Sequence, residues 1–85
     1  MKQFSYVLTN PDALQTKHMG NLTREASRFS SRMNLINGAK EAALKELRAV
    51  MGLDIQCGNR VTVTVEGKDE EAAVAAIQNY FVANM

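Results

Sequence analysis

The sequence has little of what a catalyst or a metal protein needs. Its 85 residues include one cysteine and one histidine, so an internal disulfide and a cysteine-rich metal site are excluded. With so few reactive side chains and no paired carboxylates at a predicted cleft, we expect no enzyme, no cofactor and no metal. Ten basic and nine acidic residues leave a net charge of only +1, which argues against a nucleic-acid binder.

Long apolar runs are also missing. No stretch approaches the roughly 18 consecutive apolar residues of a membrane span. Met1-Lys2-Gln3-Phe4 leads into a strand-like segment rather than a signal peptide. The share of apolar residues, 46%, and of charged residues, 22%, is that of an ordinary globular domain. We therefore expect one cytoplasmic domain over residues 1–85, with no membrane insertion and a single small core.

Two segments have the alternation of β-strands. Residues 4–9 place Phe4, Tyr6 and Leu8 on one side and end at Asn10-Pro11. Residues 61–65 alternate valine with threonine, so the valines should face the core and the threonines the open face of a sheet.

A hairpin is predicted between them. Residues 33–36 and 39–43 flank Asn37-Gly38, a pair that favours a type I′ turn. The second strand is weakly indicated, because Lys40-Glu41-Ala42-Ala43 has better helix than strand propensity. A helix over residues 39–51 is therefore the competing interpretation.

Three segments have helical spacing. The first covers residues 16–29 with Gln15 near its N-cap, and the second keeps this spacing over residues 44–51 and ends at Gly52. The third begins at the N-cap Asp69 and runs nearly to Met85. Its apolar face consists of Ala73, Val74, Ile77, Tyr80 and Phe81. The order β-α-β-β-α-β-α predicts an α+β fold, an antiparallel or mixed sheet with helices on one face.

The start of the first helix is the candidate functional site. Unpaired backbone N–H groups and the positive end of the helix dipole can hold an anion such as phosphate there. The residues at this place are Gln15, Thr16, Lys17 and His18, which add a cation and an imidazole. Asp12 is expected to shape the preceding Asn-Pro-Asp turn rather than to repel an anion.

Several short motifs, in this order and spacing, resemble the HPr family, the histidine-containing phosphocarriers of the bacterial sugar phosphotransferase system. The resemblance covers almost the whole chain without a gap and implies an open-faced β-sandwich, a four-stranded antiparallel sheet with three helices on one face. The motifs are Thr9-Asn10-Pro11, Leu14, Ala26-Ser27-Arg28-Phe29-Ser30-Ser31, Asn37-Gly38, Leu44-Lys45, Val50-Met51, Gly58, Val61-Thr62-Val63 and Glu66-Gly67-Lys68-Asp69-Glu70.

The chain departs from the family at its active-site motif, Gly-Leu/Ile-His-x-Arg-Pro-Ala. The phosphoryl-accepting histidine of the family falls on Gln15, its arginine on Lys17 and its proline on His18. A glutamine amide is not a usable nucleophile, and lysine lacks the planar fork that grips phosphate at two points. The resemblance therefore implies that transfer by the family's own route is lost, unless His18 has become the acceptor.

The resemblance also carries over a regulatory and a docking position. A regulatory relative within the family has Gln at the acceptor position too, but keeps the Arg-Pro pair and a regulatory serine, which here falls on Glu46. Glu46 is either a partial stand-in for phosphoserine or a residue favoured by the helix dipole.

The family's docking patch on the second helix falls on Leu47, Arg48 and Met51, of which Leu47 is equally well explained as core. Arg24 and Arg28 either add a basic rim or belong to a solvated helix face. Together with Lys17 and Arg24, this patch on the second helix is expected to dock on partner proteins.

We therefore expect a non-phosphorylatable or regulatory HPr-like protein that docks transiently on phosphotransferase-system proteins or on a carbon-control regulator. The alternatives are an active phosphocarrier that uses His18, and a small anion-binding domain that uses the start of the first helix. A monomer is favoured, and Cys57 is expected to be a free structural thiol.

Overall fold

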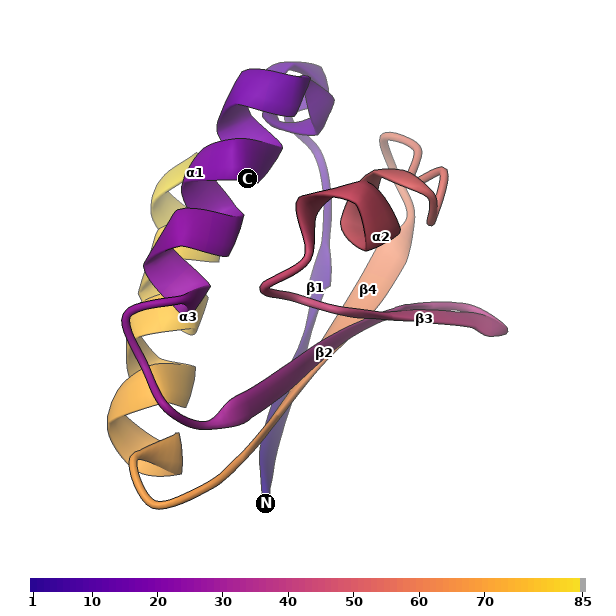
Figure 1. The fold of residues 1–85 in the computed structure, drawn as a ribbon. Helices are drawn as coiled ribbons and strands as arrows, with labels where there is room; N and C mark the ends of the chain where they lie inside the picture. Colours follow the sequence, from indigo (N-terminus) through magenta and orange to yellow (C-terminus); the bar gives the residue numbers. More distant parts are fainter. Residues whose placement is uncertain (85) are drawn as a thin grey trace.

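Four antiparallel strands form a sheet with helices on one face (Figure 1). This arrangement comes from a computed structural model, which describes residues 1–84 apart from the side chain of Ala13. The strands are β1 (Lys2–Val7), β2 (Arg32–Asn37), β3 (Lys40–Ala43) and β4 (Arg60–Glu66), and their order in the sheet is β1-β4-β2-β3. The helices are the 3-10 helix η1 (Pro11–Leu14), α1 (Thr16–Ala26), α2 (Leu47–Met51) and α3 (Glu70–Asn84).

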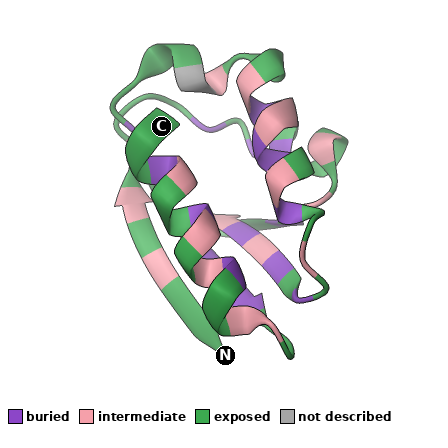
Figure 2. Cartoon of the chain, turned by 90° about the vertical axis from the view of Figure 1, so that its left-hand side faces the viewer, coloured by how far each residue is buried: buried purple, intermediate pink, exposed green. Residues whose placement is uncertain are grey.

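The central strand β4 holds the sheet together, because it pairs with β1 on one side and with β2 on the other. Val63 lies opposite both Phe4 of β1 and Leu35 of β2. Val61, Val63 and Val65 are buried, whereas the threonines between them are half-buried, so the predicted alternation is confirmed. Figure 2 shows the contrast with the edge strand β1, whose residues are exposed or intermediate.

The two long helices bury apolar residues at helical spacing against this sheet. In α1 these are Met19, Leu22 and Ala26, and in α3 they are Ala73, Ile77 and Phe81. The Phe81 ring makes edge-to-face contacts with Phe4 and Tyr6, at centroid distances of 5.4 and 5.7 Å. Such pairs contribute about 0.5–1.5 kcal/mol beyond the area they bury, and here they join α3 to β1.

The hairpin interpretation of residues 33–43 is correct, and the competing helix is wrong. The predicted type I′ turn is also wrong. Asn37 pairs with Lys40, so Gly38 and Ala39 are the two central residues. Of these two residues, only Gly38 has a positive φ, at +63°. A positive φ at the first central residue alone is the pattern of a type II′ turn. Asn37 instead donates through Nδ2 to the carbonyl of Leu53, 3.2 Å away.

Several predicted element ends need correction. The first strand lies two residues earlier than predicted, and α1 ends at Ala26 rather than at residue 29, because a turn follows. Helix α2 begins at Leu47, not at Leu44, since residues 44–45 form a turn behind β3. The break predicted before α1 contains the 3-10 helix η1, and the end of the third helix at Met85 lies outside the described residues.

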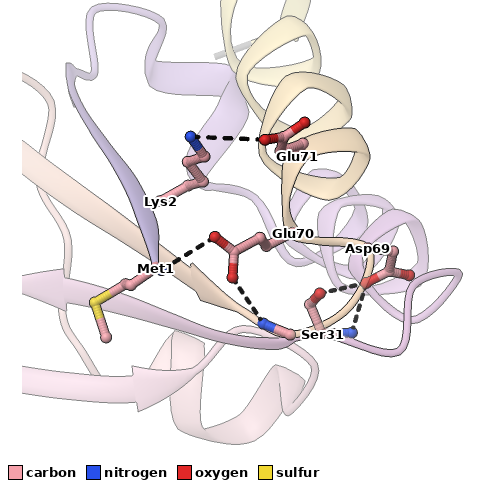
Figure 3. Close-up of polar contacts among 7 residues, drawn as sticks. Met1, Lys2, Ser31, Asp69, Glu70 and Glu71 are labelled. Carbon is pink, nitrogen blue, oxygen red and sulfur yellow. Dashed lines mark hydrogen bonds and ion pairs between the residues drawn. The ribbon is translucent and has the colours of Figure 1, made fainter.

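Asp69 stands at the N-cap of α3 as predicted, because its carbonyl accepts the N–H of Ala73 at 2.8 Å. Its carboxylate has a different role from the expected cap. It accepts the N–H of Ser31 at 3.0 Å and the hydroxyl of Ser31 (Figure 3). It also accepts the N–H of Ser30 at 2.9 Å. These bonds, first the one from the Ser31 hydroxyl and then the one from the Ser30 N–H, hold the pKa of Asp69 below its ordinary value. The carboxylate thus joins the start of β2 to the start of α3.

Glu70 strengthens the same junction (Figure 3). Its carboxylate lies 3.0 Å from the amino group of Met1 and accepts the N–H of Gly67 at 3.2 Å. The hydrogen bond from the amino group of Met1, followed by the bond from the Gly67 N–H, keeps the pKa of Glu70 below its ordinary value. The starts of β1, β2 and α3 therefore meet at one end of the molecule.

Candidate functional site

Gln15 occupies the N-cap of α1, and the resemblance to the HPr family places a histidine at this position. The Gln15 backbone is extended, at φ −71° and ψ 148°, and its carbonyl accepts the N–H of Met19 at 3.0 Å. Its exposed side chain makes no capping hydrogen bond. Thr16 and Lys17 are exposed and His18 is half-buried, so the predicted group of four residues does gather at the first turn. These four residues bring an amide, a hydroxyl, an ammonium and an imidazole to the start of α1.

The turn before α1 is built by Asn10 rather than by Asp12. The Asn10 Oδ1 accepts the N–H of Asp12 at 3.1 Å, and the carbonyl of Asp12 accepts the N–H of Gln15 at 3.2 Å. The Asn10 amide also donates to the carbonyl of Asn84 at 3.3 Å, which ties this turn to the end of α3. The backbone at Gln15 is therefore held from both sides.

Tyr80 supports the same turn from α3. Its hydroxyl donates to the carbonyl of His18 at 3.3 Å. Burial raises the pKa of Tyr80, and the nearby charge of Glu25 adds to the shift. The two partners are 62 residues apart, so sequence reasoning had no signal that would connect them.

Lys17, Gly20 and Arg24 lie on one face of α1, because they are three and four residues apart. A Cβ at Gly20 would lie 3.9 Å from Cδ2 of Leu47, so Leu47 of α2 covers the bare backbone between the two basic residues. Leu47 is half-buried and packs against the core, so it contributes to the core, and its role in docking stays a prediction.

The rest of the predicted patch is accessible. Arg48 is exposed, and Met51 is 39% exposed, which makes it one of four large exposed apolar residues in the described part of the chain. No ion pair is found for Lys17, Arg24 or Arg48 within residues 1–84. Arg28 differs, because its guanidinium contacts both carboxylate oxygens of Glu25 at 3.0 and 3.3 Å. We define the docking face as Lys17, Arg24, Leu47, Arg48 and Met51.

Glu46 is the N-cap residue of α2, and its exposed side chain makes no capping hydrogen bond. Its carbonyl accepts the N–H of Val50 at 3.0 Å. The neighbouring Lys45 donates through Nζ to the carbonyl of Phe29 at 2.6 Å, which fixes the approach to α2 against the end of α1. The Glu46 carboxylate is thereby presented to solvent beside the docking face.

Other chemistry finds little support in the described residues. Cys57 is exposed in the loop before β4, and its thiol donates to the carbonyl of Thr9 at 3.5 Å. Across residues 1–84 there is no group of three or more side chains that could hold a metal ion. None of the helices in this part of the chain is long and apolar enough to span a membrane.

Comparison with known proteins identifies the class. The family model described as "PTS HPr component phosphorylation site" matches residues 2–83. The phosphocarrier protein HPr of Mycoplasma capricolum is 32% identical over 82 residues, which cover 96% of this chain and 92% of that protein. The chain therefore belongs to the HPr family, whose members are phosphocarriers rather than enzymes.

Solved structures agree with this assignment. HPr-C-His from Thermoanaerobacter tengcongensis superposes with a TM-score of 0.92 at 27% identity, covering 99% of this chain and 94% of that one. The mycoplasma histidine-containing phosphocarrier gives a TM-score of 0.91 at 30% identity, with 96% and 93% covered. The Bacillus subtilis catabolite repression protein Crh gives 0.76 at 27% identity, with 84% and 82% covered. The expected open-faced β-sandwich is confirmed.

Proposed function

We propose that this protein is a member of the sugar phosphotransferase system that recognises partner proteins without carrying a phosphoryl group. The observation that carries the proposal is Gln15 at the N-cap of α1, exposed and without a capping bond. The resemblance places the family's acceptor at this position, and the side chain here is an amide that cannot act as a nucleophile.

The cation next to this position supports recognition rather than transfer. Lys17 is exposed and forms no ion pair within the described residues, so it remains able to meet an anion or an acidic partner. A single ammonium attracts negative charge but does not hold a transferring phosphoryl group in a two-point grip. Gln15, Thr16, Lys17 and His18 would then form the rim of a recognition site.

The docking face supplies the remaining parts of a protein-protein contact. Leu47 and Met51 are apolar, and Lys17, Arg24 and Arg48 surround them with positive charge. Such a face suits an acidic partner surface, and the charges raise the association rate more than the final affinity. Among the similar structures, Crh is described as a catabolite repression protein, which favours a carbon-control regulator as one kind of partner.

Glu46 extends this proposal to regulation. It lies directly before Leu47 of the docking face, and its carboxylate is exposed at the position of the family's regulatory serine. One negative charge would reproduce part of the effect of a phosphoserine, which carries nearly two. Partner affinity of Glu46→Ser compared with the parent tests this point, since an unchanged affinity would contradict it.

The central experiment is phosphorylation by radiolabelled phosphoenolpyruvate and the first enzyme of the system. We expect no acid-labile label on the parent protein, together with measurable binding to that enzyme or to a sugar-specific component by NMR titration. Gln15→His is the matched variant that asks whether the scaffold still supports transfer. Label on the parent that disappears in His18→Ala would overturn the proposal and assign the carrier role to His18.

A further inference from the structure

A cavity lies between the start of α1 and the segment around α2. Its volume is 180 Å³, and its lining consists of Leu14, Met19, Val50, Met51, Asp54 and Ile55. Apolar cavities of about 150 Å³ accommodate a benzene molecule, so this volume is sufficient for one long side chain. Met19 and Val50 are 2% and 1% exposed and form the floor, whereas Met51 and Asp54 are exposed and form the mouth.

Five of the six residues that line the cavity have apolar side chains. Among the six lining residues, only Asp54 carries a charge. The amide of Gln56 donates to Asp54 Oδ1 at 3.0 Å, and within residues 1–84 no hydrogen bond to the other carboxylate oxygen is found. One negative charge at the mouth of a cavity that five apolar residues line matches a side chain that has a long aliphatic part and a cationic end.

We infer that this cavity receives an arginine side chain of the docked partner protein, an inference that rests on the proposed docking function. Leu14, which lines the cavity, is adjacent to Gln15, and Met51 belongs both to the cavity and to the docking face. A partner that covers the docking face therefore passes over the mouth. The aliphatic part of the partner's arginine would pack on Met51, Ile55 and Leu14, whose thioether and aliphatic groups adapt to its shape. The guanidinium would form an ion pair with Asp54 at the mouth.

The test needs no partner protein, so its failure is distinguishable from failure of the docking proposal. Arginine capped at both ends (N-acetyl, C-methylamide) is titrated into the isotope-labelled protein and followed by NMR. Capped citrulline has nearly the same shape without the charge, and capped norleucine keeps only the apolar stem. We expect shift changes at the cavity residues and binding of arginine about two- to fivefold tighter than of citrulline.

Asp54→Asn should abolish the preference for arginine over citrulline. The variant is expected to fold, because Asp54 has φ +52° and asparagine tolerates this left-handed region well. Glu66→Gln, at an exposed residue of β4 outside the cavity, is the control and should keep the preference. Norleucine binding as tightly as arginine would overturn the inference in favour of a purely apolar anchor, and so would an absence of shifts at the cavity residues.

Discussion

The N–H of Ser31 lies 3.0 Å from a carboxylate oxygen of Asp69, and the Ser31 hydroxyl donates to the same atom. Ser31 is almost completely buried, at 1% exposure. The bond joins two segments that are 38 residues apart, the start of β2 and the start of α3. Since α3 carries Tyr80 and Asn84, both of which contact the segment before and in α1, this junction also helps to place the candidate site.

Asp69→Asn is expected to lower the thermal unfolding temperature. Asparagine keeps one acceptor oxygen, so its amide nitrogen would place a donor against the N–H of either Ser30 or Ser31, which now bond to different carboxylate oxygens. Asp12→Asn is a suitable control, because Asp12 is exposed and its contacts in the turn are made by backbone atoms. An equal loss of stability in both variants would contradict the assigned role.

The same carboxylate predicts how stability depends on pH. The pKa of Asp69 is lowered in the folded state by the Ser31 hydroxyl and by the N–H of Ser30. Its contribution is therefore fully present above the ordinary carboxyl pKa of about 4 and is lost as the pH falls through the lower folded value. Unfolding curves of the parent and Asp69→Asn, measured from about pH 7 to about pH 2, should converge at the acid end. A constant difference would be inconsistent with this expectation.

Gly67→Ala is expected to destabilise the protein by roughly 1–3 kcal/mol. Gly67 has φ +155°, and a Cβ there would lie 2.6 Å from Oγ and 2.8 Å from Cα of Ser31. Gly38→Ala has only the cost of a positive φ, because nothing lies within 4 Å of its Cβ position. Gly52→Ala has an ordinary φ of −71° and contacts of 3.4 Å. Chemical denaturation should show the largest loss of unfolding free energy for Gly67→Ala, a smaller loss for Gly38→Ala and the smallest for Gly52→Ala. Any other order would contradict this explanation.

Leu47→Ala is expected to weaken partner binding about tenfold, which corresponds to about 1.4 kcal/mol. The side chain covers the backbone of Gly20 between Lys17 and Arg24, so its loss opens the middle of the docking face. Val82→Ala removes an exposed apolar side chain of α3, 68% exposed and outside that face, and should leave affinity unchanged. Calorimetric titration measures the affinity of each variant for the partner protein, and unfolding curves show whether the two variants are equally folded. Equal affinities would remove Leu47 from the proposed contact.

Tyr80→Phe is expected to cost about 0.5–1.5 kcal/mol of stability, the usual contribution of one hydrogen bond. The lost bond is the one from the Tyr80 hydroxyl to the carbonyl of His18. Because burial, followed by Glu25, raises the pKa of Tyr80, the folded state favours the protonated phenol. The parent should therefore lose stability as the pH rises above about 10, and Tyr80→Phe should lose less. Denaturant unfolding at neutral and alkaline pH checks both points; a pH dependence that is the same in the two proteins would exclude Tyr80 as its source.

Local patterns in the sequence were sufficient for most of the elements. The alternation of Val61–Val65 with threonine and the spacing of Ala73, Ile77 and Phe81 each place one face toward the core, so β4 and α3 follow from local periodicity. The start of α1 at Thr16, with Gln15 at the N-cap, was also predicted correctly, since the Asn-Pro pair marks a break before the helix. The end of α1 and the start of α2 were predicted wrongly. Residues such as Ser27 and Lys45 next to these ends differ little in free energy between a helix and a turn.

The sequence by itself determined the order of the strands and of the three α-helices, the family, and the prediction that Gln15 replaces the family's nucleophile, because these depend on residue identity and local spacing. Only the tertiary structure decided that the Asp69 carboxylate bonds to Ser31 instead of to its own helix, that Leu47 covers Gly20, and that a cavity opens beside Asp54. Each of these brings together residues far apart in the chain. Their meeting depends on how the helices pack across the sheet, and packing distances are not encoded in any local pattern.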